Sequence, residues 1–313
     1  MRTSSGMNDK FRSPGSGLPP ILKLMNTTRR NFIKTSGFAL GSVALASQLP
    51  FGLTGCATPV AAKHDFGFQT WTIREKLVAD FPATLREMAA MGYTQVEMCS
   101  PLGYKDAGFG PLNSMTGTEM KKIIDDSGLK CVSSHYGMGE LRDSLDNRIE
   151  WATQLEMKQM VCSSFWLPEG ASVDEYRKAC EELNAIGEKT KAAGIQMVFH
   201  NHHMEFEKRG EELIYEEMMK VLNPDLVKMQ FQVAVVNIGY TAADYFRKYP
   251  GRFQSAHLAD WSKATDKQVP VGQGEVDWND FFEAAKVGGV QNFFVEMDPD
   301  AFKPSAAFLL NLS

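Results

Sequence analysis

The segment GIQMVFHNHH, residues 194–203, contains the unit from which this chain is built. Its glycine follows a long amphipathic helical pattern, its apolar run has the length of a strand, and three histidines, His200, His202 and His203, close it. Glycine ends helices because it tolerates the left-handed conformation, and an unbroken apolar run is typical of a strand buried on both faces. The segment therefore predicts a helix end, a buried parallel strand and polar side chains where the strand stops.

The same order of helical pattern, glycine and apolar run recurs along the chain, with Gly92, Gly128 and Gly289 in the place of Gly194. Strands alternating with helices over about 250 residues predict a closed (β/α)8 TIM barrel. An open doubly wound sheet is the alternative, but no GxGxxG phosphate loop follows the first predicted strand. We expect strands near residues 65–71, 93–98, 129–135, 159–165, 195–200, 227–232, 252–258 and 291–297.

The connections carry further signals. A long helix is expected over about 173–193 and a short last helix over about 304–310. The longest loop, 261–276, is placed to cover the strand ends. Asp277 follows it and is the residue type that accepts hydrogen bonds from the first turn of a helix, so we expect an N-cap there.

Residues 1–60 read as an export signal and linker, and are set apart from the barrel domain of residues 61–313. The pair Arg29-Arg30 precedes an apolar stretch, 37–50, that is too short to span a membrane. Leu53-Thr54-Gly55-Cys56 then matches a lipoprotein cleavage box. We expect export by the twin-arginine (Tat) route, a periplasmic or cell-envelope location, and membrane contact only through a lipid on Cys56.

Charge and cysteine usage narrow the function. Seven of the 33 basic and one of the 38 acidic residues lie in 1–56, which leaves 26 and 37 and a formal net charge of −11. Such an acidic body repels a phosphate backbone, so a nucleic-acid partner is not expected. The chain has no CxxC pair, and we expect its remaining cysteines to be buried free thiols.

Imidazoles and carboxylates gather at the predicted strand ends. His135, His200 and His257 close three strands, and Glu97 and Glu296 close two more. The C-terminal strand ends of a parallel barrel meet at one face, where its chemistry is done. Such groups bind a divalent metal or move protons, so we expect one site at this rim.

At this point the chain resembles the sugar phosphate isomerase/epimerase family of xylose-isomerase-like TIM barrels. The resemblance runs from about residue 66 to 310, and the order and spacing of the matching segments make it specific. These segments are Val96-Glu97, Phe199-His200-Asn201-His202, Tyr249-Pro250-Gly251-Arg252-Phe253, His257-Leu258-Ala259-Asp260, Val271-Gly272-Gln273-Gly274-Glu275-Val276-Asp277-Trp278 and Val295-Glu296.

The resemblance implies one divalent metal (Mn²⁺, Zn²⁺, Mg²⁺ or Co²⁺) held by groups from strands five to eight. His257 and Glu296 match the usual ligands of the last two strands. His200 stands where many relatives have glutamate, and Gln232 where aspartate is usual. Imidazole is a good ligand and a glutamine carbonyl a weak one. The implied shell of His200, Gln232, His257 and Glu296 leaves the cation under-neutralised, unless Glu205 adds a carboxylate.

The resemblance also implies the chemistry. A metal chelated by a sugar carbonyl and its neighbouring hydroxyl stabilises the enediolate formed when a base removes the α-proton. Epimerases of the family use two glutamates, of which only Glu296 is present, with His200 in place of its partner. His202 is a candidate second base because its ordinary pKa is near neutrality. One base suffices for isomerisation, or for β-elimination next to a ketone.

The expected partner is a small carbohydrate. Glu97 and His135, from strands two and three, are expected across the barrel from the metal, bonded to sugar hydroxyls. Trp71, Trp166 and Trp261 follow predicted strands, and their indole faces suit the apolar face of a sugar ring. Many relatives carry lysine where this chain has Ala259. That difference, together with export, favours an unphosphorylated substrate.

Two other functions remain open. A lyase acting on 3-keto glycosides would use the same proton abstraction, and a non-catalytic sugar-binding lipoprotein would use none. The apurinic endonucleases related to this family need a multi-zinc cluster and a basic face, and this acidic chain supplies neither. The leading hypothesis is a metal-assisted sugar isomerase or epimerase-like enzyme working through an enediolate.

Overall fold

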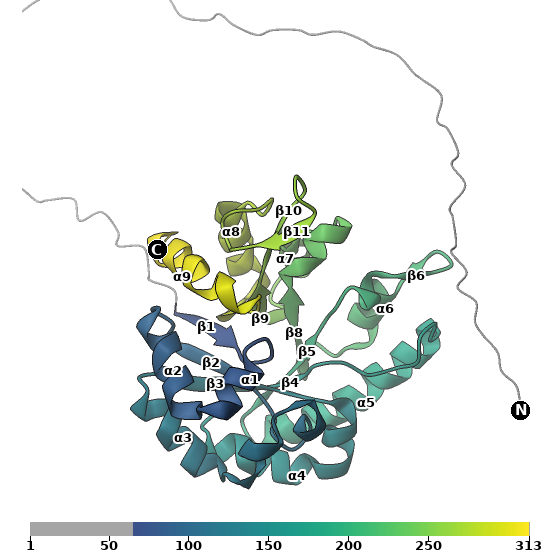
Figure 1. The fold of residues 1–313 in the computed structure, drawn as a ribbon. Coiled ribbons are helices and arrows are strands. Elements are labelled where there is room, and N and C mark those ends of the chain that lie inside the picture. The colour runs from purple at the N-terminus through teal and green to yellow at the C-terminus, as the bar shows by residue number, and fades with distance from the viewer. Residues whose placement is uncertain (1–64, 313) are drawn as a thin grey trace, which may run out of the picture. The chain divides into compact units, whose positions relative to one another are not determined.

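The computed structural model describes residues 65–312, which fold as a closed barrel of parallel strands (Figure 1). The barrel order is β1-β12-β9-β8-β5-β4-β3-β2. All eight predicted strands are confirmed, so the TIM barrel is correct. Its strands are β1 (Phe66–Gln69), β2 (Gln95–Cys99), β3 (Lys130–Tyr136), β4 (Gln159–Cys162), β5 (Gln196–His200), β8 (Val227–Gln232), β9 (Phe253–Leu258) and β12 (Asn292–Val295).

Helices cover the outside of the barrel (Figure 1). The long helix predicted over 173–193 is α5, and the last predicted helix is longer than expected. The helices are α1 (Arg74–Ala79), α2 (Phe81–Ala90), α3 (Gly117–Asp126), α4 (Met138–Gln154), α5 (Val173–Ala192), α6 (Ile214–Val221), α7 (Ala242–Lys248), α8 (Trp278–Gly288) and α9 (Phe302–Leu312), with 3-10 turns η1 (Lys105–Ala107), η2 (Gly110–Ser114), η3 (Met204–Phe206), η4 (Val233–Ile238) and η5 (Pro299–Ala301).

Local sequence signals explain where several helices begin and end. Ser172 and Glu175 form a capping box at the start of α5, which satisfies backbone donors that a helix leaves free. Asp277 caps α8 by accepting from the backbone of Asp280, as predicted. Gly194 (φ 77°) and Gly289 (φ 84°) adopt the left-handed conformation after α5 and α8, which confirms their expected role as helix ends.

The predicted loop 261–276 is more ordered than expected. Strand β10 (Asp260–Ser262) pairs with β11 (Lys267–Val269) as a hairpin. A second hairpin joins β6 (Lys208–Arg209) to β7 (Glu212–Leu213). Beyond β11 the chain turns around the buried Asp260 carboxylate, which accepts from the backbone nitrogens of Gly272 (3.0 Å), Gly274 (3.1 Å) and Val276 (3.2 Å). A Cβ on Gly274 would lie 2.2 Å from Asp260 Oδ1, so this turn requires glycine.

The barrel interior is polar at its centre. Gln159 Nε2, fully buried, donates to Ser133 Oγ (2.9 Å) and to Ser255 Oγ (3.0 Å). Most TIM barrels fill this space with branched aliphatic side chains. Because buried polar groups are tolerated when their hydrogen bonds are made, this arrangement gives a rigid polar floor beneath the strand ends.

Two register shifts lie next to this floor. Strands β2 and β3 change register between Val96 and Glu97, and β8 and β9 between Met229 and Gln230. Such irregularities re-aim side chains and are common beside active sites. Gln230 Nε2 donates to Glu97 Oε2 at 2.8 Å. The two shifts therefore precede two residues that bond to each other inside the barrel.

The cysteines of the barrel are free and buried, as predicted: Cys99, Cys131, Cys162 and Cys180. Across residues 65–312 we find no helix with the length and apolar character needed to cross a membrane. The predicted export signal, and Cys56 with it, lie outside the described residues.

Candidate active site

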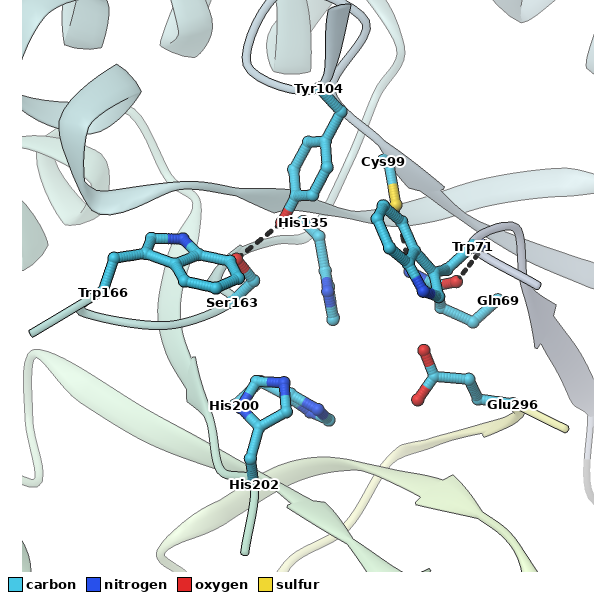
Figure 2. Close-up of a pocket in the computed structure, with 10 residues that line it drawn as sticks. All are labelled: Gln69, Trp71, Cys99, Tyr104, His135, Ser163, Trp166, His200, His202 and Glu296. Atoms are coloured by element: carbon cyan, nitrogen blue, oxygen red, sulfur yellow. Dashed lines mark hydrogen bonds between the residues drawn. The ribbon is translucent and has the colours of Figure 1, made fainter. Parts of the chain in front are cut away.

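A cavity of about 160 Å³ opens at the C-terminal ends of the barrel strands (Figure 2). Six of the residues singled out from sequence line it: Trp71, His135, Trp166, His200, His202 and Glu296. Figure 2 shows Glu296 on one side of the cavity, with His200 and His202 on another and His135 between the two tryptophans. The barrel therefore gathers most of the residues predicted from their positions at or just after strand ends around one cavity.

Four predicted residues do not line this cavity. Glu97 and His257 are fully buried beneath it, and Gln232 is hydrogen-bonded to Glu296. Trp261 lies on the β10–β11 hairpin, where its backbone nitrogen donates to Asp260 Oδ1 at 2.9 Å. The sequence did not predict this hairpin, and Trp261 on it is not among the residues that line the cavity.

Sequence reasoning missed four residues that line the cavity: Gln69, Cys99, Tyr104 and Ser163. Gln69 and Cys99 are the last residues of β1 and β2. A search of strand ends for amide and thiol groups, in addition to imidazoles and carboxylates, would have found them. Tyr104 comes from the long connection after β2, and its hydroxyl donates to Ser163 Oγ at 2.5 Å. No sequence signal pointed to that connection.

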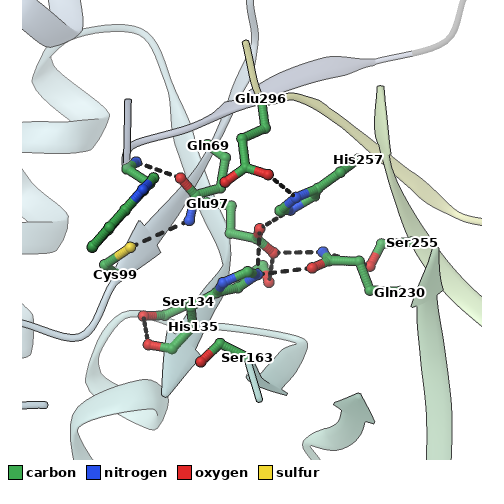
Figure 3. A network of polar contacts seen from close by, with 12 residues as sticks. Gln69, Glu97, Cys99, Ser134, His135, Ser163, Gln230, Ser255, His257 and Glu296 are labelled. Atoms are coloured by element: carbon green, nitrogen blue, oxygen red, sulfur yellow. Dashed lines mark hydrogen bonds and ion pairs between the residues drawn. The ribbon is translucent and has the colours of Figure 1, made fainter. Parts of the chain in front are cut away.

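Glu97 is the centre of the polar network below the cavity (Figure 3). Its Oε1 lies 2.5 Å from His257 Nε2 and 3.0 Å from His135 Nε2. Its Oε2 accepts from Ser133 Oγ (2.5 Å) and from Gln230 Nε2 (2.8 Å). Four donors satisfy this carboxylate, which is fully buried. In this arrangement it is the floor of the site and has no free face for a sugar hydroxyl.

This contact changes the expected layout. From sequence, Glu97 and His135 were expected across the barrel from the metal that His257 helps to hold. In the structure, Glu97 contacts both His135 and His257. The eight-stranded barrel is narrow enough for inward side chains from opposite strands to meet. The imidazoles of His135 and His257 lie parallel, with centroids 5.1 Å apart and 6° between their planes.

His257 lies between two carboxylates. Its Nδ1 is 2.9 Å from Glu296 Oε2, and its Nε2 contacts Glu97. Burial alone lowers a histidine pKa, but the charges and hydrogen bonds of Glu296 and Glu97 outweigh it and raise the pKa of His257 to about 9. Conversely, burial would raise the pKa of Glu97 and Glu296, yet the neighbouring histidines hold both below their usual range.

Gln232 orients Glu296. Its Nε2 donates to Glu296 Oε2 at 2.8 Å, and its Oε1 accepts from the backbone nitrogen of Ala234 at 3.2 Å. These two partners determine which terminal atom of the Gln232 side chain is the nitrogen and which is the oxygen. The carbonyl oxygen, which the sequence argument offered to a metal, is thus engaged with the backbone. Both donors to Glu296 bind Oε2, so Oε1 is left to the cavity.

Three histidines form a cluster with the donor spacing of a metal site. One ring nitrogen each from His135, His200 and His257 lies within 4.8 Å of the others, and all three residues are buried. The Nδ1 atoms of His200 and of His202 are buried without a hydrogen-bond partner among the described residues. Burial, together with neighbouring His257, holds the pKa of His200 well below its usual value, so its ring is neutral and keeps a lone pair for a ligand.

His202 is a weaker base than its ordinary pKa suggested. Burial lowers the pKa of His202 to about 4, even though the charge of Glu296 opposes the shift. Its backbone nitrogen donates to Glu205 Oε2 at 2.7 Å. Glu205 is itself buried, which raises its pKa to about 7. The Glu205 carboxylate therefore supports the backbone of His202 and is not among the groups lining the cavity.

With this geometry in place, comparison with known proteins identifies relatives. A family model described as xylose isomerase-like TIM barrel matches residues 85–312. A sugar phosphate isomerase/epimerase from Parabacteroides distasonis has a similar structure, with a TM-score of 0.68 at 27% identity over 82% of this chain and 97% of that one. A xylose isomerase-like TIM-barrel protein from Mycobacterium smegmatis, in complex with magnesium, shares the fold with a TM-score of 0.59 at 13% identity, over 80% of this chain and 96% of that one.

Among curated proteins, an inosose dehydratase of Clostridium perfringens is similar to part of the chain. The two are 23% identical over 152 residues, which is 42% of this chain and 50% of that protein. The chain thus matches about half the length of this relative.

Proposed function

This chain belongs to the xylose isomerase-like TIM-barrel family, and we propose that it is a metal-assisted enzyme that removes a proton beside the carbonyl group of an unphosphorylated sugar or keto-sugar. The reaction runs through an enediolate and ends in isomerisation. The structural likeness to a sugar phosphate isomerase/epimerase supports the reaction class.

The observation that carries the proposal is the setting of Glu296. Its Oε2 is held by His257 Nδ1 at 2.9 Å and by Gln232 Nε2 at 2.8 Å, while the carboxylate lines the cavity. Neighbouring His257 keeps the pKa of Glu296 low, so the group is ionised at neutral pH. A fixed carboxylate with one oxygen facing a substrate cavity is the geometry of a general base.

The residues present fit a divalent metal. His257 Nδ1 and Glu296 face each other, His200 is neutral with an unpartnered buried Nδ1, and the spacing of the imidazoles within 4.8 Å suits a shared ion. We assign His200, His257 and Glu296 as ligands, with the Gln232 side chain beside them. The magnesium complex of the Mycobacterium smegmatis protein supports a metal in this family. A bound metal would polarise the sugar carbonyl and acidify the carbon next to it.

Individual residues of the chain then have separate roles in the reaction. Glu296 takes the proton, and neutral His202, which Figure 2 shows on another side of the cavity, faces the substrate without competing charge. The Nε2 of His135 is held by Glu97 and Gln230, so its other nitrogen is left to bind a substrate hydroxyl. With a single carboxylate base, two-sided epimerisation is less suited to this site than a one-base reaction.

A second one-base reaction is favoured by the similarity to inosose dehydratase. In β-elimination, the base takes the α-proton of a 3-keto glycoside, and the electron pair of the broken C–H bond forms a carbon–carbon double bond. The glycosidic oxygen leaves with the electron pair of its own bond and is protonated. Glu296 suffices as the base, so the same site serves either reaction.

The cavity favours a substrate without phosphate. None of the residues that line it is lysine or arginine, and Ala259 stands where many relatives carry lysine. The ionised Glu296 would repel a phosphate dianion, which needs a positive partner when it is taken out of water.

We also propose that the enzyme is exported and held at the cell envelope by a lipid on Cys56. The twin-arginine pair and the cleavage box of residues 53–56 support this location. An exported enzyme meets free sugars and glycosides, in line with a cavity that lacks cations.

Proton exchange tests the function. Metal-loaded protein is incubated in D₂O with free sugars and with 3-keto glycosides, and NMR follows the loss of the α-proton. We expect the wild type to exchange the α-proton of at least one keto compound. The Glu296→Gln variant should exchange none. Product analysis separates isomerisation from elimination. A sugar that binds but shows no exchange would make this a sugar-binding lipoprotein instead.

A further inference from the structure

The mouth of the cavity carries an indole in an unusual position. Trp166 is 67% exposed and has φ of 53°. A positive φ is rare and strained for a bulky side chain. Two other non-glycine residues of the described chain share this conformation, Glu156 and Asp266, and neither lines the cavity. A large apolar side chain that is both exposed and held in a strained backbone points to a role in binding.

The backbone leading from β4 to Trp166 is anchored by hydrogen bonds. Its own nitrogen donates to Ser164 Oγ at 3.1 Å, and the nitrogen of Ser163 donates to the carbonyl of Tyr136 at 2.9 Å. Ser163 Oγ also accepts from the Tyr104 hydroxyl. Residues 163–166 are therefore held by hydrogen bonds while the indole of Trp166 remains uncovered.

A second indole faces it across the opening. Figure 2 shows Trp71 and Trp166 on opposite sides of the cavity mouth. Trp71 is 36% exposed, its ring is stacked on Phe109 at 6.5 Å and 19°, and the Arg74 guanidinium lies 4.5 Å from its centroid. These contacts fix the ring of Trp71. The mouth is thus framed by two held aromatic surfaces.

The volume of the cavity limits how much of a substrate it can hold. Its volume is about 160 Å³, which equals the space of roughly five waters at about 30 Å³ for each water in the liquid. That space suits one sugar ring and is too small for two. One sugar ring near Glu296 therefore fills the cavity, and the indoles remain for whatever is attached to that ring.

We propose that the substrate is a glycoside of at least two sugar rings, with the first ring in the cavity and the second between Trp71 and Trp166. The first-ring position rests on the proposed function. The apolar C–H face of a sugar packs on an indole while its hydroxyl edges stay in water. A second sugar ring suits this mouth because two indole faces frame it, and none of the residues that line the cavity is lysine or arginine.

The test compares the binding of one-ring and two-ring sugars. Calorimetric titration of the whole metal-loaded protein compares glucose and fructose with cellobiose, maltose and sucrose. We expect at least one disaccharide to bind roughly tenfold more tightly than either monosaccharide, a gain of the size that aromatic contacts supply. Trp166→Gly removes the indole without straining a left-handed backbone, and it should abolish that gain by weakening disaccharide binding far more than monosaccharide binding.

Matched variants make the result specific. Trp166→Phe should restore part of the gain, and Val287→Ala, which trims an exposed apolar side chain on α8, should change nothing. Equal affinity for one-ring and two-ring sugars would overturn the two-ring substrate and leave the proposed function standing. Equal weakening of both classes by Trp166→Gly would do the same. Failure of every sugar to bind would overturn both.

Discussion

Glu97 Oε1 lies 2.5 Å from His257 Nε2, while the opposite nitrogen of the same ring lies 2.9 Å from Glu296 Oε2. One imidazole thus connects the buried floor of the barrel to the carboxylate that faces the cavity. Carboxylates that bind the far nitrogen of a metal-ligating histidine fix its ring and increase its basicity. Glu97 is therefore a positioning residue for the proposed metal site.

The first prediction follows from this contact. Glu97→Gln keeps the shape of the side chain but removes the charge and one acceptor, so His257 is less firmly held with Nε2–H toward the floor. We expect divalent metal affinity to fall by roughly 10- to 100-fold, measured by calorimetry with Mn²⁺. The ¹⁵N shifts of His257 should show a changed tautomer or charge state.

Ser133→Ala is the control for that variant, since it removes one donor to Glu97 Oε2 and leaves the contact with His257. Its metal affinity should fall much less. Unchanged affinity and unchanged ¹⁵N shifts in Glu97→Gln would show that the floor does not position the imidazole.

The second prediction concerns Gln232. Replacing it with aspartate restores the carboxylate usual in related barrels and sets it beside Glu296, to which the glutamine now donates. Without metal the two negative charges repel, and a cation relieves that repulsion. We expect Gln232→Asp to bind Mn²⁺ about tenfold more tightly, equivalent to about 1.4 kcal/mol, without a matching rise in turnover.

Gln232→Asn separates charge from length, because its side chain is as short as that of aspartate and is neutral. It should bind metal no better than the wild type. If Gln232→Asp binds Mn²⁺ no more tightly than the wild type, position 232 lies too far from the ion to influence its binding.

The third prediction concerns stability against pH. Burial raises the pKa of Glu140 to about 7, against an ordinary value of 4.5. The folded state thus holds this proton more tightly than the unfolded chain, so the resulting stability is complete below about pH 4.5 and lost as pH rises through 7. Glu140→Gln cannot ionise, and relative to it the wild type should lose about 2–3 kcal/mol between pH 5 and 8, at roughly 1.4 kcal/mol per pKa unit.

Urea unfolding of both proteins at several pH values measures this difference. The carboxylate accepts from Ser100 Oγ at 2.5 Å, at the start of the connection that carries Tyr104 to the cavity. Parallel pH profiles of the two proteins would contradict the assignment to Glu140.

The fourth prediction concerns the N-terminal segment. If Cys56 carries lipid, Cys56→Ala should move the protein from the membrane fraction to the soluble fraction, as detected by fractionation and immunoblotting. The melting temperature of the barrel should not change, because the first strand begins at Phe66. A variant that stays with the membrane would indicate another anchor.

The sequence predicted those parts of the molecule that depend on local pattern. The strands could be placed from their apolar runs, four of which follow a glycine that ends a helix, Gly92, Gly128, Gly194 and Gly289. The barrel then brings these ends together, which is why His135, His200, His202 and Glu296 lie around one cavity.

The remaining features depend on tertiary structure. The role of Glu97 follows register shifts that no periodicity reveals. The lowered pKa of His202 comes from its burial, and the place of Trp261 from a hairpin within an expected loop. Tyr104 reaches the cavity through a connection whose path is set by packing.

Metal content tests the central claim most directly. Wild type, His257→Ala and Glu296→Gln are purified, loaded with Mn²⁺ or Zn²⁺, freed of excess ion and assayed by elemental analysis, with Val287→Ala as a folded control. We predict about one ion per chain in the wild type and the control, and little or none in the two site variants, each with a melting temperature that shows a folded barrel. Full occupancy in both site variants would contradict the account.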